Sequence, residues 1–345
     1  DGHGFAAQIA GKGAAALVVS EPVEDVAGMD VTVIQVADTR YALALLSAAW
    51  FGHPAGKMKV IGITGTKGKT TTTYLVKSIL EHAGFKVGLM GTTGILVGNC
   101  LVQADNTTPE SYVIQENFAR MYQAGMEIVV MEVSSQALKQ RRTAGFTFDY
   151  GIFTNLATDH IAPGEHASLE EYIACKGMLF GQCRIGIVNG DDAHVADVVK
   201  GHTCQLATYG LGEGCMLRAS GLGLVRDPGK LGVAFHVSGL VELDAQAAMP
   251  GRFSVYNALC AIALCRHFGV EVDAVQQALL EVRVKGRIEK VEMPQRFTLL
   301  IDYAHNAMAL ENLLAALREY RPGRLVCLFG CGGDRAKRRR YEMGE

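Results

Sequence analysis

The sequence predicts an α/β protein whose largest domain contains a mainly parallel β-sheet covered by helices. Apolar, strand-like runs alternate with stretches of helical periodicity through the middle of the chain, as expected for repeated βα units. One of these strands, at residues 60–64, leads through a glycine-rich turn into a helix. Similar α/β patterns before and after this region predict three domains, at residues 1–56, 57–285 and 286–345.

The first region has the pattern of a small α/β unit. Residues 13–20 and 31–36 are predicted to be short strands, and residues 40–51 a helix. The turn-forming sequence at residues 53–56, His-Pro-Ala-Gly, marks the end of this unit.

The second region carries the alternation that defines the parallel sheet. The stretch at residues 211–248 is richer in glycine and in alternating residues, so it is predicted to be an antiparallel insertion. The apolar strands of the parallel sheet are predicted at residues 60–64, 127–131, 151–154 and 185–188.

The third region begins near Gly286 and starts another strand–helix–strand pattern. Residues 297–301 and 324–329 are predicted to be strands, and residues 308–320 a helix. A sheet of this size would leave an open edge, so we expect this domain to be truncated. The chain also begins at Asp1 and not at Met, so we expect the first domain to be partial.

Composition excludes several classes of protein. The chain of 345 residues is 49% hydrophobic and 20% charged, which is globular, and its net charge of −2 favours neither nucleic acid nor an anionic membrane surface. No apolar run approaches the roughly 18 residues that cross a bilayer, so no membrane insertion is predicted. The nine cysteines include no C-x-x-C pair, which favours reduced thiols in the cytoplasm.

The strongest single motif is the glycine-rich turn after residues 60–64. Glycines allow backbone N–H groups to close on phosphate oxygens, and the following helix N-terminus adds partial positive charge. Lys69 can reach the outer phosphates, and the Thr70 hydroxyl can hold Mg²⁺. Ile63 stands where a full Walker motif has glycine, so a ligand-free turn is the alternative. The predicted ATP-binding residues of this loop are Gly65, Thr66, Lys67, Gly68, Lys69, Thr70 and Thr71.

Acidic and imidazole side chains follow two other strands of the predicted sheet. Glu132 follows residues 127–131, and His160 lies shortly after residues 151–154. Ligands of α/β sheets lie at these carboxyl ends, and Mg²⁺ prefers carboxylate, hydroxyl and water oxygens. Singly, Glu132 could begin a helix, His160 could be an ordinary loop residue, and Lys176 could be a solvated lysine on an amphipathic helix.

Several segments, in a consistent order along the whole chain, resemble the Mur ligase family, and most closely its MurE branch. Gln136 stands where the family motif has His, and Lys67, Ser254 and Ala307 also depart from common residues. The resembling segments are G-T-K-G-K-T-T at 65–71, M-E-V-S-S-Q-A-L at 131–138, G-I-F-T-N-L-A-T-D-H at 151–160, Y-x-x-x-K-x-x-L-F at 172–180, G-R-F-S-V-Y-N-A-L at 251–259, G-R-I-E at 286–289, D-Y-A-H-N at 302–306, G-C-G-G-D-R at 330–335 and D-G-H-G-F at 1–5.

The resemblance implies a three-domain architecture with a P-loop central domain and a Rossmann-like C-terminal domain. It implies that Lys69, Glu132, His160 and Lys176 are catalytic, and that Lys176 is carbamylated. Two Mg²⁺ ions would be held by Thr70, Glu132, His160 and the Lys176 carbamate. It also implies further ATP contacts from the third region at Arg287, Asp302, His305 and Asn306.

The resemblance further implies two substrates besides ATP. One is a UDP-N-acetylmuramoyl dipeptide, and the other is a free amino acid, either meso-diaminopimelate or L-lysine, which Arg335 would contact. The implied reaction joins them in an amide bond through an acyl phosphate, in peptidoglycan precursor synthesis. The residues expected to contact the muramoyl dipeptide are Asn106, Thr107, Thr108, Ser134, Gln140 and Arg142.

Two alternatives stay open at this point. Another ligase with the same fold, such as a folylpolyglutamate synthetase, would share the phosphate loop but not the M-E-V-S-S and N-terminal D-G-H segments together. A catalytically dead nucleotide-binding homologue would not need to keep Lys69, Glu132, His160 and Lys176.

Overall fold

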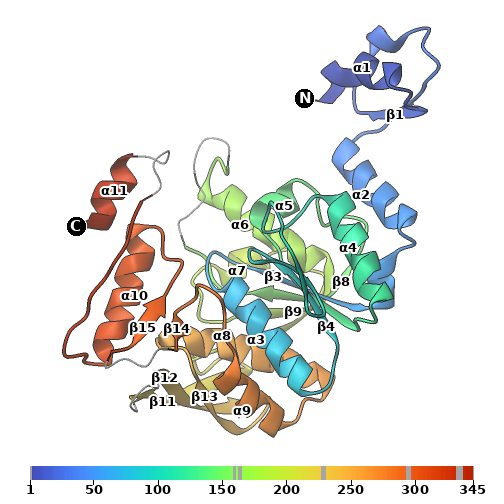
Figure 1. The fold of residues 1–345 in the computed structure, drawn as a ribbon. Coiled ribbons are helices and arrows are strands. Elements are labelled where there is room, and N and C mark those ends of the chain that lie inside the picture. The colour runs from blue at the N-terminus through green and yellow to red at the C-terminus, as the bar shows by residue number, and fades with distance from the viewer. Residues whose placement is uncertain are drawn as a thin grey trace.

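A computed structural model describes residues 2–157, 161, 165–226, 231–292, 297–331 and 337–344. The predicted α/β architecture is confirmed, with a central sheet of eleven strands covered by helices (Figure 1). Two smaller two-stranded sheets belong to the N-terminal and C-terminal regions. Among the described residues, no helix combines the length and apolar character needed to span a membrane. All nine cysteines are described, and all are free thiols.

The middle of the large sheet is parallel, in the order β10-β9-β8-β3-β7-β4. All four strands predicted for this region are present, displaced by a few residues at their ends. Crossover helices join parallel strands of this kind, so their carboxyl ends lie at one edge of the sheet. The bounds are β3 (Lys59–Thr64), β4 (Val87–Gly91), β7 (Ile128–Glu132), β8 (Phe148–Phe153), β9 (Cys183–Asn189) and β10 (Gln205–Gly210).

Antiparallel strands extend both ends of this parallel core. At one end β5 (Gly94–Val97) and β6 (Cys100–Val102) follow β4. At the other end β11 (Leu217–Val225) pairs in parallel with β10, and β12 (Gly232–Gly239) and β13 (Leu243–Ala247) continue antiparallel. The predicted antiparallel insertion is thus confirmed, and its strands are a continuation of the main sheet.

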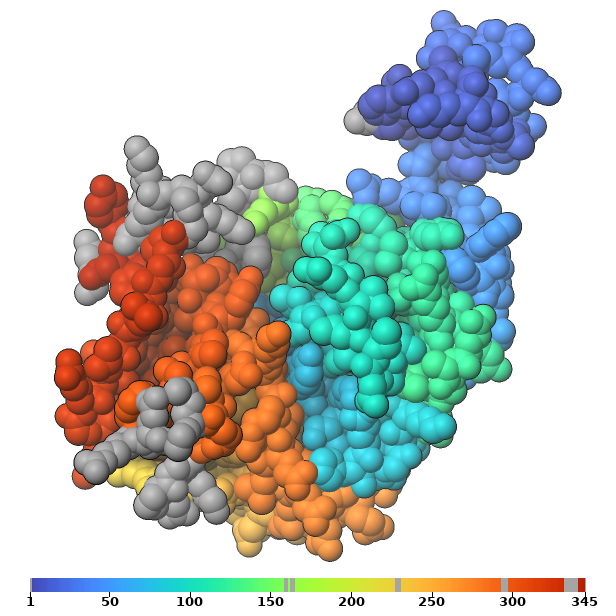
Figure 2. All heavy atoms as spheres, in the orientation of Figure 1, coloured from blue at the N-terminus to red at the C-terminus, as the bar shows by residue number. Residues whose placement is uncertain are grey.

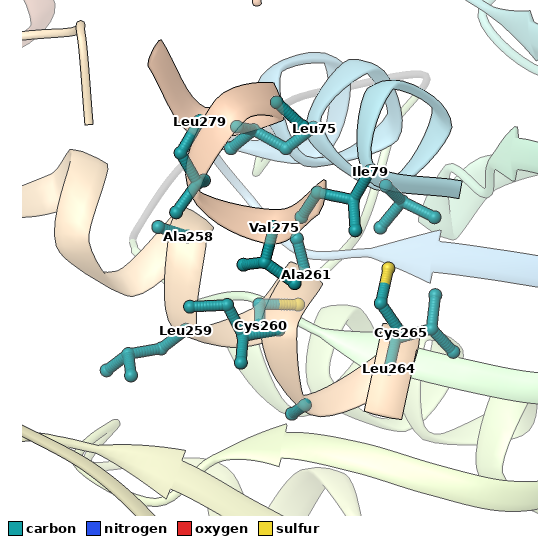
Figure 3. Close-up of a cluster of buried hydrophobic side chains, with 14 of the residues drawn as sticks. Leu75, Ile79, Ala258, Leu259, Cys260, Ala261, Leu264, Cys265, Val275 and Leu279 are labelled. Carbon is teal, nitrogen blue, oxygen red and sulfur yellow. The ribbon is translucent and has the colours of Figure 1, made fainter. Parts of the chain in front are cut away.

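Hydrophobic side chains alternate between the two faces of the sheet. On β3, Ile61 and Ile63 belong to one buried cluster and Val60 to the other, as a side-chain period of two requires. The first cluster packs α3 (Lys69–His82), α8 (Arg252–Cys265) and α9 (Val272–Glu281) on one face (Figure 3). The other cluster includes residues of α4 (Ser111–Gln123) and α5 (Ser135–Lys139). The result is three layers, and the phosphate loop lies at the edge of the middle one, where the parallel strands have their carboxyl ends.

The N-terminal region has the two strands and the long helix that the sequence predicts, preceded by a short helix at residues 6–11 that it did not predict. They are α1 (Ala6–Gly11), β1 (Ala16–Val19), β2 (Thr32–Gln35) and α2 (Thr39–Trp50), with β1 and β2 paired in parallel. Figures 1 and 2 show the first three standing away from the body of the molecule, which they reach through α2. The Asp38 carboxylate caps α2 by accepting hydrogen bonds from two backbone N–H groups.

The C-terminal region confirms one predicted strand and the predicted helix but not the second strand. β14 (Glu289–Val291) pairs antiparallel with β15 (Leu299–Ile301), and α10 (Ala307–Glu319) follows. The prediction of a strand at residues 324–329 is wrong. A strand forms only where a neighbour supplies hydrogen bonds, and within the described part of the chain this region's sheet holds only β14 and β15. The apolar side chains of this segment, including Leu328 at 98%, are consequently exposed.

The remaining elements are short helices and 3₁₀ turns. They are α6 (Leu169–Gly177), α7 (Val195–Val198) and α11 (Lys337–Gly344), with 3₁₀ turns at Gly2–Phe5, Glu24–Val26, Pro54–Lys57, Met178–Gly181 and Arg266–Phe268.

The packing of α9 on α3 and α8 generates a stability prediction. Leu279 is fully buried in this contact, so Leu279→Ala should lower the free energy of unfolding by about 2–5 kcal/mol. The neighbouring Leu280 is 42% exposed, and Leu280→Ala should change it by only about 0.5 kcal/mol. Urea unfolding followed by circular dichroism measures both variants, and equal losses would contradict the packing described.

Candidate active site

The glycine-rich turn has a backbone shape that only glycine adopts easily. It joins the end of β3 to the first residue of α3, with φ of +146° at Gly65 and +85° at Gly68. A Cβ atom at Gly65 would overlap the Thr154 hydroxyl, and one at Gly68 would lie 2.6 Å from Asn257 Oδ1. Conformation and space therefore both require glycine at these two positions.

Residues at the end of β8 hold this turn in place. Asn155 Oδ1 accepts a hydrogen bond from the Lys67 N–H at 2.9 Å, and Asn155 Nδ2 donates to the Lys67 carbonyl at 3.0 Å. The Thr154 hydroxyl donates to the same carbonyl at 2.7 Å. The sequence analysis assigned no role to Thr154 or Asn155. Their position directly after a strand beside β3 was the available signal.

Lys69, the first residue of α3, folds back over the turn. Its ammonium donates hydrogen bonds to the carbonyl groups of Gly65 at 2.8 Å and Thr66 at 3.1 Å. Thr71 follows in the same buried first turn of the helix. A positive charge beside a glycine-rich turn and a helix N-terminus is an arrangement suited to an oligophosphate.

The buried Glu132 carboxylate lies against the start of α3. In the pairing of β3 with β7, Ile63 lies opposite Glu132. The Thr70 hydroxyl donates to the Glu132 carboxylate, with its oxygen 2.9 Å and 3.0 Å from the two carboxylate oxygens. Thr92 donates to the same carboxylate from its N–H at 2.9 Å and its hydroxyl at 3.1 Å. A hydroxyl beside a carboxylate is a donor set that fits Mg²⁺. Thr92 was missed, although it follows β4, the other neighbour of β7.

Lys176 is buried, which corrects the reading of it as a solvated lysine. Its side chain is 1% exposed, and its ammonium lies 4.3 Å from the centroid of the Tyr172 ring.

The Cys175 thiol, next to Lys176 in the sequence, has a raised pKa, chiefly because it is buried. The thiol therefore stays neutral near pH 7 and is a poor nucleophile.

Lys69 and Lys176 line the same cavity, which has a volume of about 180 Å³. Two cationic side chains at one small cavity favour an anionic occupant. The Gln136 Oε1 atom in its wall is buried without a hydrogen-bond partner among the described residues. A buried acceptor of this kind is costly unless a ligand or water donates to it. The other residues of the wall are Gly65, Ser134, Ser135, Glu165, His166 and Tyr172.

Four of the residues expected to bind the muramoyl dipeptide lie together beside Glu132. The Thr108 hydroxyl donates to the Glu132 carbonyl at 2.9 Å and accepts from the Ser134 N–H at 3.0 Å. Arg142 donates to the Thr108 carbonyl at 2.9 Å, and Thr107 lies 3.0 Å from Thr92 through their hydroxyl oxygens. All four residues are thus linked to Glu132 by hydrogen bonds, directly or through a neighbouring residue.

Among the residues that the structure describes, the other two predicted to bind the muramoyl dipeptide, Asn106 and Gln140, make no hydrogen bond to Glu132 or to the phosphate loop. Asn106 is exposed, and Gln140 is a half-buried residue at the end of α5. His160 and Arg335 lie outside the described residues. Within the described part of the chain, no three His, Cys, Asp or Glu side chains form a metal-binding group.

The residues of the third region that were predicted to bind ATP make their contacts within that region. The Arg287 guanidinium lies 5.0 Å from the Tyr303 ring centroid, and the His305 ring lies 5.1 Å from it. The Asp302 carboxylate accepts from two backbone N–H groups of this region, and the Asn306 side chain caps α10. The contacts of these side chains are local, and none of those described reaches the phosphate loop.

Fold and site together define an α/β protein with a P-loop-type phosphate site, and comparison with known proteins shows that it is an ATP-dependent ligase. Residues 63–265 match the Mur ligase middle domain, and residues 286–345 match the Mur ligase, glutamate ligase domain. The UDP-N-acetylmuramoyl-L-alanyl-D-glutamate--2,6-diaminopimelate ligase of Clostridium perfringens is 39% identical over 352 residues, covering the whole chain and 71% of that relative. The chain belongs to the Mur ligase family.

Solved structures agree at the level of the fold. A UDP-N-acetylmuramoyl-L-alanyl-D-glutamate--2,6-diaminopimelate ligase superposes with a TM-score of 0.81 and 24% identity, over 99% of this chain and 70% of that one. A Mycobacterium tuberculosis folylpolyglutamate synthase complexed with ADP gives a TM-score of 0.66 and 17% identity, over 82% and 69%. Ligases with different substrates therefore share this architecture.

The left-handed Gly68 generates a prediction about nucleotide binding. Gly68→Ala must shift the turn or Asn257, at a backbone cost of about 1–3 kcal/mol, so the affinity for ADP should fall roughly tenfold or more. Gly84 has a similar φ of +90° at the other end of α3, with open space around a Cβ. Gly84→Ala should cost stability but leave the affinity unchanged. Isothermal titration calorimetry with ADP and Mg²⁺ compares them, and unchanged affinity in Gly68→Ala would contradict the cradle.

Proposed function

We propose that this protein adds a third amino acid, 2,6-diaminopimelate, to UDP-N-acetylmuramoyl-L-alanyl-D-glutamate. The observation that supports this most is the convergence of two buried or half-buried lysines, Lys69 and Lys176, on one cavity beside the phosphate loop. A transferring phosphoryl group concentrates negative charge, which the Lys69 ammonium would stabilise directly and the Lys176 carbamate would stabilise by holding Mg²⁺. The reaction belongs to peptidoglycan precursor synthesis, and nine free thiols suit a cytoplasmic location.

In this proposal the chain supplies position and charge. Lys69 and the turn's N–H groups hold the ATP phosphates, so that the D-glutamate carboxylate of the dipeptide can attack the γ-phosphate in line. ADP leaves, and the product is an acyl phosphate. The amine of the third amino acid then attacks the acyl carbon and phosphate departs. Thr108, Ser134 and Arg142 would orient the dipeptide.

The metal and the modified lysine complete the proposed charge balance. Thr70 and Glu132 would hold Mg²⁺, with His160 as a further ligand, and the ion would neutralise phosphate charge when bound. Carbamylation would convert the Lys176 cation into an anion able to hold or orient a second Mg²⁺. The domains at residues 1–56, 57–285 and 286–345 would bind the UDP-linked substrate, ATP and the amino acid. Closure of the third would bring Arg287, His305 and Arg335 to the site.

The choice of 2,6-diaminopimelate over L-lysine rests on the relatives. The Clostridium perfringens relative, 39% identical, is named for 2,6-diaminopimelate, whereas the folylpolyglutamate synthase shares 17% identity and the fold alone. The Gln136 departure lies in the wall of the cavity, so it bears on how this chain holds its substrates.

A substrate panel with a lysine variant tests the proposal. ADP release by the full-length protein should require UDP-N-acetylmuramoyl dipeptide together with 2,6-diaminopimelate, and should be small with L-lysine or with folate and glutamate. Lys69→Ala should abolish turnover because it removes the charge over the loop. Lys77→Ala, at a half-buried position later in α3 where the ammonium pairs with Glu81, serves as the control and should stay active. Substantial turnover in Lys69→Ala, or activity with folate, would refute the assignment.

The carbamate proposal has its own chemical test. Lys176→Ala should lose activity, and short carboxylic acids should partly restore it by placing a carboxylate in the vacated space. The ligation rate is measured with increasing acetate or propionate, with wild type as the reference. An unimpaired variant would remove the idea, and a dead variant that no acid restores would count against the carbamate.

A further inference from the structure

Tyr172 connects three parts of the proposed site and has no assigned role. Its hydroxyl is hydrogen-bonded to the Thr66 hydroxyl of the phosphate loop, with the two oxygens 3.1 Å apart. Its ring lies 4.3 Å from the Lys176 ammonium and 5.1 Å from the His166 ring. The Tyr172 side chain is completely buried.

We propose that Tyr172 is a positioning residue that couples the phosphate loop to Lys176. The two residues are four apart on α6, so they lie on the same face of the helix. The ring face packs against the end of the lysine side chain and attracts its ammonium before carbamylation, which fixes where the lysine nitrogen lies when CO₂ adds to it. The same nitrogen would carry the carboxylate after carbamylation. Its position therefore sets where that negative charge would lie relative to the loop.

Simple filling of the core does not account for these contacts. A phenyl ring would fill the same volume, and burying a hydroxyl is unfavourable unless it finds a partner. The partner here is a phosphate-loop side chain, which is itself tied to the backbone because Thr66 Oγ1 accepts from the Ala157 N–H at 3.0 Å. The Thr66 side chain therefore links α6 to the phosphate loop.

The third contact extends the connection to the strand end that carries Glu132. His166 is buried, and its Nε2 atom lies 2.9 Å from the Ser135 hydroxyl at the start of α5. Helix α5 begins at Ser135, three residues after Glu132 ends β7. The Tyr172 ring therefore packs near an imidazole that is hydrogen-bonded to the start of α5. Tyr172 thus lies where the loop, α5 and α6 meet.

Two substitutions separate the hydroxyl from the ring. Tyr172→Phe keeps the ring and removes the bond to Thr66, so the dissociation constant for ADP and the KM for ATP should rise about fivefold, with kcat little changed. Tyr172→Leu also removes the ring face that positions the lysine nitrogen, so kcat, little changed in Tyr172→Phe, should fall about tenfold. Tyr209→Phe is the matched control because Tyr209 is equally buried and its hydroxyl donates to the Phe153 carbonyl at 3.1 Å. Its KM and ADP affinity should stay at the wild-type values.

The outcomes distinguish this inference, which rests on the proposed function, from that function itself. ADP titration needs no ligation, so it tests the Tyr172–Thr66 link even if no ligation product forms. If the wild-type protein binds ADP but forms no ligation product with the proposed substrates, only the proposed function is overturned. Unchanged ADP affinity in Tyr172→Phe would overturn the link to the loop, and so would an equal change in Tyr209→Phe. If Tyr172→Leu does not fold, Tyr172→Phe still decides that link.

Discussion

The site depends on how tightly the turn after β3 is held between its neighbours. Gly65 lies against Thr154, and Gly68 lies against Asn257 of α8, so no side chain can be inserted on either side. Asn155 pairs with both backbone groups of Lys67. The turn is consequently fixed before any ligand arrives, and a preorganised site does not spend binding energy on ordering itself.

The pairing of β3 with β7 transmits this order to the proposed metal ligands. Ile63 lies opposite Glu132, so the carboxylate reaches the first turn of α3, where the Thr70 hydroxyl donates to it. A shift of one residue in this register would turn Glu132 to the opposite face of the sheet. Successive side chains of these strands are buried in the two hydrophobic clusters on opposite faces of the sheet, so such a shift is unfavourable. The packing of the core therefore fixes the register that brings Glu132 to the site.

Sequence patterns predicted the central sheet well because its strands are apolar and its turns are rich in glycine. They also placed Lys69, Thr70 and Glu132 at one edge, since each follows a strand or starts the helix after it. They failed at residues 324–329, where apolar, β-prone residues have no strand beside them in the described region. Periodicity also gave the wrong environment for Lys176, because one helix does not reveal that phosphate-loop residues line the same cavity. Thr92 and Asn155 escaped notice because their partners are distant in sequence.

The central claim is that a nucleotide and a divalent cation bind where the phosphate loop meets Glu132. Anomalous diffraction from crystals grown with Mn²⁺ and a non-hydrolysable ATP analogue measures this directly. The account predicts an anomalous peak within coordination distance of Thr70 Oγ1 and directed towards the Glu132 carboxylate, with the triphosphate bound against the turn at residues 65–70. A cation remote from both side chains, or a nucleotide bound away from this turn, would contradict it.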